Sequence, residues 1–286
     1  MTTATPALIL GCGYLGLCLA RRLVNDGTPV IAITRSSARA EELRQQLPLT
    51  VYCVNLDDQS AVGALLRVLP PFGTALYCLL PPKALASAAQ LQGLVAIAAH
   101  AQVTTAVLTS STGVYDVAAG SVVNAETPLV PNSPRAAALA AIEQAWLING
   151  RCRVVRLAGL YGPGRVIGEA TLRAGEALPG APTQWLNLIE VDDAAALLVA
   201  CGQSPHGARI ELGSDGTPVT RGDYYHFVAH CLKTAPPRFA PNLTTRGGDK
   251  RCDPTSTMRR LGWTPRYRDF RAGIRAALDA QVAREY

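Results

Sequence analysis

The chain has 286 residues, of which 49% are hydrophobic and 17% are charged. This composition provides enough apolar side chains for a sizeable core and argues against a disordered protein. The formal net charge is +6, and the basic residues are scattered, with no run of five or more. This distribution argues against a nucleic-acid-binding tail and favours an anionic cofactor or substrate, although a basic surface without function would have the same composition.

The eight cysteines include no C-x-x-C pair and no spacing typical of a zinc site, so we expect no metal and a reducing compartment. No basic region precedes the first apolar run, so we expect no signal peptide and a cytoplasmic protein. The charge-poor stretch 84–103 contains Gln90, Gln92 and His100. It is therefore predicted to be a packed helix, with no membrane partner.

Strand and helix patterns alternate through the first half of the chain. Apolar, β-branched runs predict strands at 7–11, 30–34, 50–54, 74–80, 105–110 and 153–157. Helical patterns lie between them, at 14–26, 38–47, 59–69, 83–100 and 134–149. This alternation predicts an α/β fold with a doubly wound parallel sheet that helices cover on both faces.

A glycine-rich turn, G-x-G-x-x-G, joins the first predicted strand to the first predicted helix. It contains Gly11, Gly13, Tyr14, Leu15 and Gly16. In this context the first glycine makes the turn, the second lets the backbone approach a pyrophosphate, and the third lets helix and strand pack closely. We therefore predict a Rossmann-type core in which these residues bind a dinucleotide on the helix N-terminus. The alternative is a glycine turn without a ligand.

The residues after the second predicted strand discriminate between two cofactors. An NAD site has an acid there, which bonds the ribose 2′-hydroxyl, whereas this chain has Thr34, Arg35 and Ser36, followed by Arg39. A guanidinium binds a 2′-phosphate, and an acid would repel it. We therefore predict NADP(H), bound by Arg35 and Ser36, with NAD(H) as the less favoured cofactor. The alternative is that Arg35 is only a solvated residue at the start of the next helix.

The pattern loosens after residue 159, where glycine and proline are frequent. We predict a dinucleotide-binding core over 1–160 and a mainly substrate-binding lobe over 161–286. A helix at 191–201 and a strand near 208–212 lie within a segment, about 185–213, that is expected to return to the core. Helices near 221–232 and 269–284 are assigned to the smaller C-terminal lobe.

Several later segments carry further motifs: L-T-S-S-T-G-V-Y at 108–115, E-T-P at 126–128, R-L-A-G-L-Y-G-P-G-R at 156–165, N-L-I-E-V-D-D at 187–193 and L-G-W-T-P at 261–265. Together with the glycine turn they resemble an extended short-chain dehydrogenase/reductase of the NAD-dependent epimerase/dehydratase family. The resemblance implies that the adenine lies beside Asn55 and Leu56, at the end of the third strand. Leu80, at the end of the fourth strand, is assigned to the cofactor site as well. The following Lys83 is interpreted as a solvated residue at the start of a helix.

The family's usual catalytic pair, Tyr-x-x-x-Lys, is missing. A neighbouring lysine and the cationic nicotinamide lower the pKa of that tyrosine, so that it passes a proton near neutral pH. In the helix that begins at Pro134, the chain has Arg135 and Leu139 instead, and no tyrosine lies between 116 and 160. The chain resembles the YeeZ-like branch, which also lacks the pair. This resemblance implies the fold and the cofactor site but does not supply a reaction.

The remaining candidate site residues follow from the family positions. Ser111 aligns with the serine that orients the substrate oxygen, and its alternative role is to end the strand. Tyr115 is predicted at the rim of the cleft as a catalytic residue and possible proton donor, although a packing role is also typical of it. Glu126, Tyr161 and Arg165 are predicted to bind substrate, and Arg165 would clamp an acidic group unless it is a surface arginine.

Three functions remain open. The first is an NADP(H)-dependent reductase of a small carbonyl or imine, and the second is a catalytically inactive NADP(H)-binding protein that senses redox state. A sugar-nucleotide epimerase or dehydratase is least favoured, because oxidising a sugar hydroxyl needs the missing base. The expected partner is a small-molecule substrate, and the oligomeric state stays open, a homodimer included.

Overall fold

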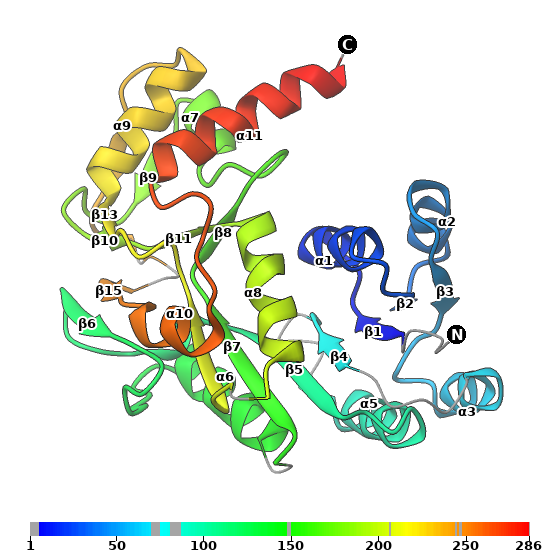
Figure 1. Ribbon diagram of the computed structural model, residues 1–286. Coiled ribbons are helices and arrows are strands. Elements are labelled where there is room, and N and C mark those ends of the chain that lie inside the picture. The colour runs from blue at the N-terminus through cyan, green and yellow to red at the C-terminus, as the bar shows by residue number, and fades with distance from the viewer. Residues whose placement is uncertain are drawn as a thin grey trace. The chain divides into compact units, whose positions relative to one another are not determined.

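The computed structural model describes residues 6–69, 75–80, 87–147, 150–205, 207–243, 245 and 248–285 (Figure 1). Contacts divide the chain into two compact units, and each unit is assembled from separate segments. Unit 1 comprises 1–110, 141–155 and 195–209, and unit 2 comprises 111–140, 156–194 and 210–286. The predicted division near residue 160 stays a prediction, and Lys83 lies outside the described residues.

The described part of the chain contains a seven-stranded central sheet in the order β12-β7-β5-β4-β1-β2-β3. Its strands are β1 (Ala7–Leu10), β2 (Val30–Thr34), β3 (Thr50–Cys53), β4 (Ala75–Cys78), β5 (Thr105–Ser111), β7 (Cys152–Leu157) and β12 (Ile210–Gly213). Parallel pairing joins β1 to both β2 and β4, β2 to β3, and β4 to β5. The strand order reverses at β1 and β4, so the predicted Rossmann-type α/β fold is confirmed.

Two layers of helices cover the strands of unit 1. Figure 1 shows α1 and α2 on one face and α3 and α5 on the other. Their bounds are α1 (Tyr14–Asn25), α2 (Ser37–Gln46), α3 (Gln59–Val68) and α5 (Ala88–His100). Side chains of Ser36, Asp58 and Ser87 cap α2, α3 and α5 by accepting backbone N–H groups. These caps define the residue at which each helix begins. They therefore also define which residues remain in the loops that follow the strands.

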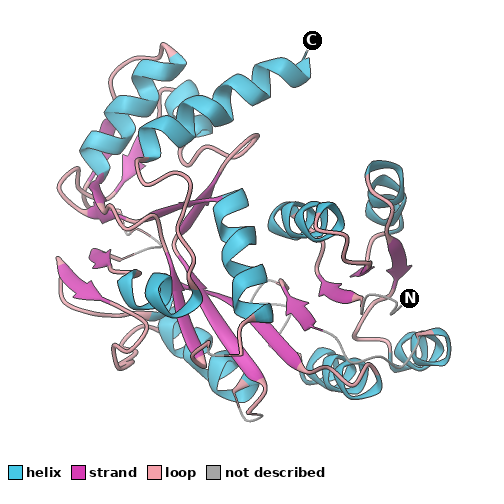
Figure 2. Ribbon diagram, in the orientation of Figure 1, coloured by secondary structure: helices cyan, strands magenta, loops and turns pink. Residues whose placement is uncertain are grey.

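Unit 2 is built around helices and short strands (Figure 2). Its helices are α7 (Glu169–Arg173), α9 (Arg221–Leu232), α10 (Thr255–Leu261) and α11 (Phe270–Glu285), and α6 (Pro134–Trp146) and α8 (Val191–Gln203) contribute residues to both units. Four two-stranded sheets pair β6 (Ser121–Val123) with β15 (Lys250–Cys252), β8 (Gly159–Tyr161) with β11 (Leu188–Glu190), β9 (Ala177–Pro179) with β14 (Arg238–Ala240), and β10 (Trp185–Leu186) with β13 (Val219–Thr220). An apolar core that includes Leu188, Tyr224 and Phe270 lies within this unit.

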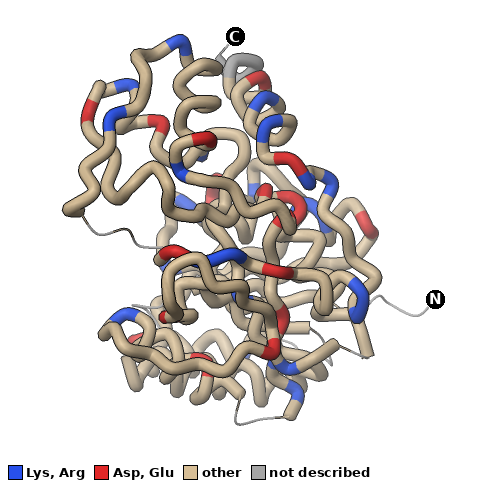
Figure 3. The backbone as a smooth tube through the Cα atoms, turned by 90° about the vertical axis from the view of Figure 1, so that its left-hand side faces the viewer, with Lys and Arg blue, Asp and Glu red and all other residues tan. Residues whose placement is uncertain are grey.

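Charged residues of both signs are interspersed along the chain (Figure 3). Among the described residues, no helix is both long enough and apolar enough to cross a membrane. Cys53, which lies within a predicted apolar strand, is exposed at the end of β3.

Candidate functional site

A cavity of about 330 Å³ opens at the carboxyl ends of β1 to β4 in unit 1. Its lining comes mainly from the segments that follow these strands, at 10–13, 33–36, 54–56 and 79–80, with Arg39 and Gln90 from two helices. Ligands of open α/β sheets bind at this edge, where the strand order reverses. The lining includes seven residues that the sequence assigns to the cofactor: Gly11, Gly13, Arg35, Ser36, Asn55, Leu56 and Leu80.

The three glycines of the turn meet three different surroundings. Gly11 has a φ of +88°, and a Cβ there would lie 3.1 Å from the backbone of Leu79. A Cβ on Gly16 would lie 2.7 Å from the carbonyl oxygen of Gly11, so only glycine lets the helix pack this closely on the turn. A Cβ on Gly13 would meet nothing within 4 Å. The open side of the turn is therefore at Gly13, as the approach of a pyrophosphate requires.

Helix α1 begins at this turn without a side-chain cap. Gly13 is its N-cap residue, and Tyr14, Leu15 and Gly16 form the first turn. The first N–H groups of a helix have no carbonyl partner within the helix, and the helix dipole adds a partial positive charge there. These residues therefore fit the pyrophosphate of a dinucleotide.

Two arginines line the cavity, and they differ in exposure and in hydrogen bonding. Arg35 is exposed, and its guanidinium makes no hydrogen bond or ion pair with another described residue. Arg39 is half-buried, and its Nε donates to the carbonyl oxygen of Cys12 at 3.0 Å. Its Nη2 donates to the carbonyl oxygen of Gly13 at 3.3 Å, and its Nη1 lies 2.6 Å from Glu42 Oε1. The hydrogen bond from Arg39 lowers the pKa of Glu42. Arg35 is therefore the cation that remains available to a ligand.

A hydrogen-bond network fastens the start of α5 to the loop after β3. Asp57 accepts hydrogen bonds from Ser87 Oγ at 2.7 Å and from Gln90 Nε2 at 2.6 Å, which lower its pKa. Asn55 Oδ1 accepts the Asp57 N–H at 3.2 Å, which fixes the Asn55 side chain at the cavity. Gln90 was not among the predicted site residues, although Ser87 and Gln90 have the S-x-x-Q spacing of a capping box.

Cys12 lies inside the glycine turn and is 2% exposed. Its burial raises the pKa of the thiol to about 11, against the opposite influence of Arg39. This cysteine is therefore a protonated thiol at neutral pH, and only the thiolate is a reactive nucleophile.

Ser111 ends β5 and is half-buried. Its Oγ accepts the Gly113 N–H at 3.1 Å, at the start of the single turn η1 (Thr112–Val114). A hydroxyl that accepts one hydrogen bond still has its own proton to donate, so this geometry fits a serine that orients a substrate oxygen. At the positions of the missing pair, Arg135 is exposed and Leu139 is buried.

The structure corrects the predicted rim position of Tyr115, which is only 3% exposed. Its hydroxyl donates to the carbonyl oxygen of Asn124 at 2.6 Å and accepts from Arg156 Nη1 at 2.9 Å. The Arg156 guanidinium also lies 4.8 Å from the centroid of the tyrosine ring. This buried hydroxyl therefore links the segments of Asn124 and Arg156. It is not exposed enough to donate a proton to a substrate.

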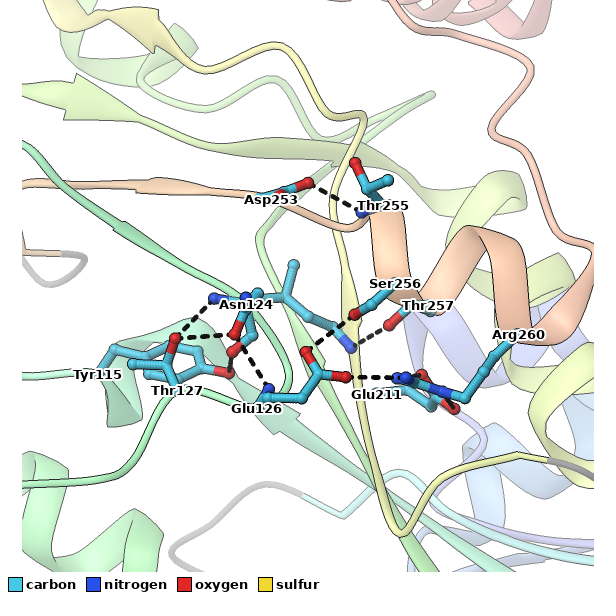
Figure 4. Close-up of polar contacts among 11 residues, drawn as sticks. Tyr115, Asn124, Glu126, Thr127, Glu211, Asp253, Thr255, Ser256, Thr257 and Arg260 are labelled. Carbon is cyan, nitrogen blue, oxygen red and sulfur yellow. Dashed lines mark hydrogen bonds and ion pairs between the residues drawn. The ribbon is translucent and has the colours of Figure 1, made fainter.

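Glu126 is exposed, but its carboxylate is engaged by two side chains of unit 2, so its predicted role as a substrate contact stays a prediction. Its Oε1 pairs with Arg260 Nη1 at 2.8 Å, and its Oε2 accepts from Ser256 Oγ at 3.0 Å (Figure 4). Arg260 pairs through its other nitrogens with Glu211, whose side chain is fully buried. We call Tyr115, Asn124, Glu126, Glu211 and Arg260 the unit 2 polar cluster. Glu126 fastens α10 to the loop after β6 and has both carboxylate oxygens engaged.

The other two predicted substrate contacts have opposite exposures. Tyr161 is fully buried in the core of unit 2, so the structure corrects its predicted role as a substrate contact. Arg165 is exposed on a tight turn, where its backbone and that of Gly162 exchange hydrogen bonds of 2.9 and 3.1 Å. Its assignment to an acidic substrate group stays a prediction.

Two buried carboxyl groups of unit 2 have raised pKa values. Glu190, where the family usually has histidine, accepts the N–H groups of Asp192 and Asp193 at the start of α8. Asp215 is 2% exposed, and its Oδ1 accepts the Thr217 N–H at 2.9 Å. Burial raises the pKa of each carboxyl to about 7. Both side chains therefore hold a proton well above the pH at which an exposed carboxyl releases it.

The fold and the glycine turn define a nicotinamide-dinucleotide-binding protein of the α/β class. The chain belongs to the NAD-dependent epimerase/dehydratase family, whose model matches residues 7–213. It resembles the YeeZ-like branch, as the sequence predicted. Protein YeeZ of Escherichia coli K12 is 27% identical over 274 residues, which cover 91% of this chain and 96% of YeeZ.

Solved structures have the same fold. A functionally unknown conserved protein from Silicibacter pomeroyi is 25% identical with a TM-score of 0.81, and the match covers 97% of this chain and 99% of that one. The Bordetella bronchiseptica enzyme WbmG in complex with NAD is 19% identical with a TM-score of 0.80, and the match covers 99% of this chain and 95% of that one. Family and fold together support a nicotinamide cofactor and an NAD(P)-dependent enzyme or binding protein.

Proposed function

We propose that this protein is an NADP(H)-dependent oxidoreductase that reduces a small carbonyl or imine substrate. The observation that carries the cofactor preference is Arg35, a cavity-lining guanidinium that makes no hydrogen bond or ion pair with another described residue. No acid lies in the 33–36 segment of the lining, so a 2′-phosphate meets a cation there. The charge of Arg35 also acts on Asp57, whose pKa it lowers, but the two side chains form no ion pair. NAD(H), which lacks this phosphate, gains nothing from Arg35.

The proposal gives each group at the cavity one task. The first turn of α1 binds the pyrophosphate, and Arg35 and Ser36 bind the 2′-phosphate. Asn55 and Leu56 contact the adenine, and Leu80 packs against the cofactor. The bound nicotinamide supplies the hydride, as it does in enzymes of this cofactor generally.

Ser111 donates a hydrogen bond to the substrate oxygen or nitrogen in this proposal. The chain offers no tyrosine and lysine pair to deliver a proton, and proton transfer of that kind contributes about 10²–10⁴-fold to the rate. An imine is protonated in water before the hydride arrives, so it tolerates the loss of the pair better than a ketone does. We therefore expect faster turnover of imines than of ketones.

The cofactor preference is tested by calorimetric titration with NADPH and NADH. The parent should bind NADPH more tightly, and Arg35→Glu should remove this preference. Arg21→Glu, an equal charge change at an exposed position of α1, is the matched control and should keep the preference. Equal affinities in the parent that Arg35→Glu leaves unchanged would refute the preference for NADPH.

The second candidate function is an NADP(H)-binding redox sensor without turnover. It is favoured by Tyr115 and Glu126, since both predicted site residues are engaged in bonds that hold unit 2 together. The raised pKa of Cys12 argues against a sensor that works through this thiol. A screen of carbonyls and imines with NADPH deuterated at C4 separates the two functions. Deuterium in any product supports the reductase, and a conformational change on NADPH binding without any transfer supports the sensor.

A further inference from the structure

Arg39 is the one side chain of α2 that reaches back to the glycine turn among the hydrogen bonds of the described residues. Its three guanidinium nitrogens have three different partners: the carbonyl oxygens of Cys12 and Gly13, and the carboxylate of Glu42. The partners in the turn lie 26 and 27 residues away in the sequence. A planar fork of donors fits two neighbouring carbonyl oxygens, whereas an ammonium group cannot reproduce this geometry.

The local structure of α2 fixes the direction of this guanidinium. Ser36 caps the helix, and its Oγ accepts the Arg39 N–H at 3.3 Å, which sets Arg39 in the first turn. Glu42, three residues later on the same face of the helix, holds Nη1. The remaining two donors are thereby left to face the glycine turn. The side chain is held at both ends, so it forms a brace between α2 and the turn.

The bonds to the two carbonyl oxygens also orient the N–H groups of the turn. The peptide unit is planar and trans, so its carbonyl oxygen and the next N–H point in opposite directions. Fixing the Cys12 oxygen therefore fixes the Gly13 N–H. The Gly13 oxygen accepts both Arg39 and the Leu17 N–H, at 3.3 and 2.9 Å, and these two bonds together fix the Tyr14 N–H. The Gly13 N–H already donates to Gly11 at 2.9 Å, so the N–H of Tyr14 opens the series available to an anion at the start of α1.

We infer that Arg39 is a positioning residue that holds the glycine turn in its pyrophosphate-binding conformation and so sets the affinity for either dinucleotide. The inference rests on the dinucleotide binding in the proposed function. A glycine turn loses much conformational entropy when it becomes ordered. A side chain that orders the turn before the cofactor arrives lowers the entropy lost on binding. Because the pyrophosphate is common to both cofactors, removing the brace should weaken both by the same factor.

The competing interpretation makes Arg39 a second cation for the 2′-phosphate. Arg39→Lys and Arg39→Met separate the two interpretations, because lysine keeps the charge but loses the fork. If Arg39 is a brace, both variants should bind NADPH and NADH about tenfold more weakly, the loss expected from removing charge-assisted hydrogen bonds. Arg35→Gln, in contrast, should weaken NADPH alone. Parent-like binding by Arg39→Lys, or a loss confined to NADPH in Arg39→Met, would overturn the inference.

Arg44 provides the matched control on the same helix. Its Nη2 donates to the carbonyl oxygen of Val51 at 2.7 Å and its Nη1 pairs with Glu41, so Arg44→Met also removes a bond to backbone and an ion pair. This variant should bind both cofactors as the parent does. A loss of affinity in Arg44→Met equal to that in Arg39→Met would assign the effect to α2 in general and overturn the inference.

A measurement on the protein without cofactor distinguishes failure of this inference from failure of the proposed function. Hydrogen exchange of the Gly13 and Leu17 amides, which donate to the carbonyl oxygens of Gly11 and Gly13 at 2.9 Å, should be faster in Arg39→Met than in the parent or in Arg44→Met. If the parent binds neither dinucleotide, the proposed function fails, and the exchange result alone then decides whether Arg39 holds the turn. Equal exchange in all three proteins would overturn the inference.

Discussion

The cavity of unit 1 and the unit 2 polar cluster contain the same kinds of residue and use them in opposite ways. In unit 1, Arg35 lines a cavity and makes no bond to another described residue, and the open side of Gly13 faces nothing. In unit 2, the polar atoms of Tyr115, Glu126 and Arg260 form hydrogen bonds or ion pairs with one another or with neighbouring segments. Polar residues in a family motif are therefore candidates for ligand contact only where their polar atoms remain available.

Filling the open side of the glycine turn in unit 1 should have the strongest effect on cofactor binding. Gly13→Leu should abolish binding of both cofactors, an effect of more than about 100-fold, because the side chain would occupy the approach of the pyrophosphate. The variant should stay folded, since nothing lies within 4 Å of the added Cβ. Gly63→Leu, at an equally open position of α3, is the control and should bind the cofactors normally. Cofactor binding by a folded Gly13→Leu protein would contradict the assignment of the turn.

The next largest effect tests whether the unit 2 polar cluster is structural. Arg260→Met should lower the free energy of unfolding by about 3 kcal/mol, because it leaves the fully buried Glu211 without this partner. Arg173→Met, which removes the ion pair of an exposed arginine with Glu169, should cost less than about 1 kcal/mol. Urea unfolding of the two variants measures the difference. Similar small losses in both variants would mean that the cluster contributes little to stability.

Substitutions at Ser111 and Tyr115 should have opposite effects on turnover and stability. Ser111→Ala should reduce turnover about tenfold or more with little change in stability, since it removes the proposed donor to substrate. Tyr115→Phe should lower the free energy of unfolding by about 1–3 kcal/mol, because it removes two buried hydrogen bonds, and should leave turnover per folded molecule unchanged. Assays with the substrate that accepts deuterium, together with thermal unfolding, measure both effects. If Tyr115→Phe instead lost turnover while keeping the stability of the parent, the structural role of Tyr115 would be refuted.

The smallest expected effect concerns the pH dependence of unit 2. The pKa of Asp215 is about 7 in the folded chain and 3.8 for an ordinary aspartate, so the folded state holds the proton more tightly. Stability should therefore fall as the pH rises from about 4 to about 7, and the loss should be complete above 7. Asp215→Asn keeps an acceptor for Thr217 and has no proton to lose. It should exceed the parent in stability at pH 8, on the order of 1 kcal/mol, with a smaller gain at pH 5.

Thermal unfolding at pH 5 and pH 8 checks this prediction. Asp26→Asn, the same substitution at an exposed position, is the control and should follow the parent at both values. Some pH dependence should remain in Asp215→Asn, because Glu190 also has a pKa of about 7. An Asp215→Asn protein whose stability falls as much as that of the parent would refute the assignment.

The sequence predicts the fold of the first half of the chain well because its signals are local. Strands of four or five residues and the helices between them occur within one or two residues of the predicted bounds at 7–68. The paired strands at 159–161 and 188–190 were missed, because three residues are too few to show a strand period. The glycine turn was predicted from its own neighbours. The bonds of Arg39 were not, since their partners lie 26 and 27 residues away and no local pattern records them.

Tyr161 and Glu126 show why the rest of the candidate site could not be predicted. A family motif states which residue occurs at a position, and it leaves open whether the side chain faces a core or a cavity. Tyr161 ends the short strand β8 and enters the core, whereas Glu126 meets Arg260, which lies 134 residues away in the sequence. Both outcomes depend on contacts between distant segments, which one sequence does not reveal.

The assembly of both units from separate segments has a consequence for synthesis of the protein. The chain passes from one unit to the other after residues 110, 140, 155, 194 and 209, so no single cut separates the units. On the ribosome, unit 1 stays incomplete until residue 209 has been made, although its first strands emerge long before. A fragment that ends near residue 160 would lack Leu197, Leu198 and Cys201, which are fully buried. Such a fragment would expose the apolar surface that they cover, and we expect it to aggregate.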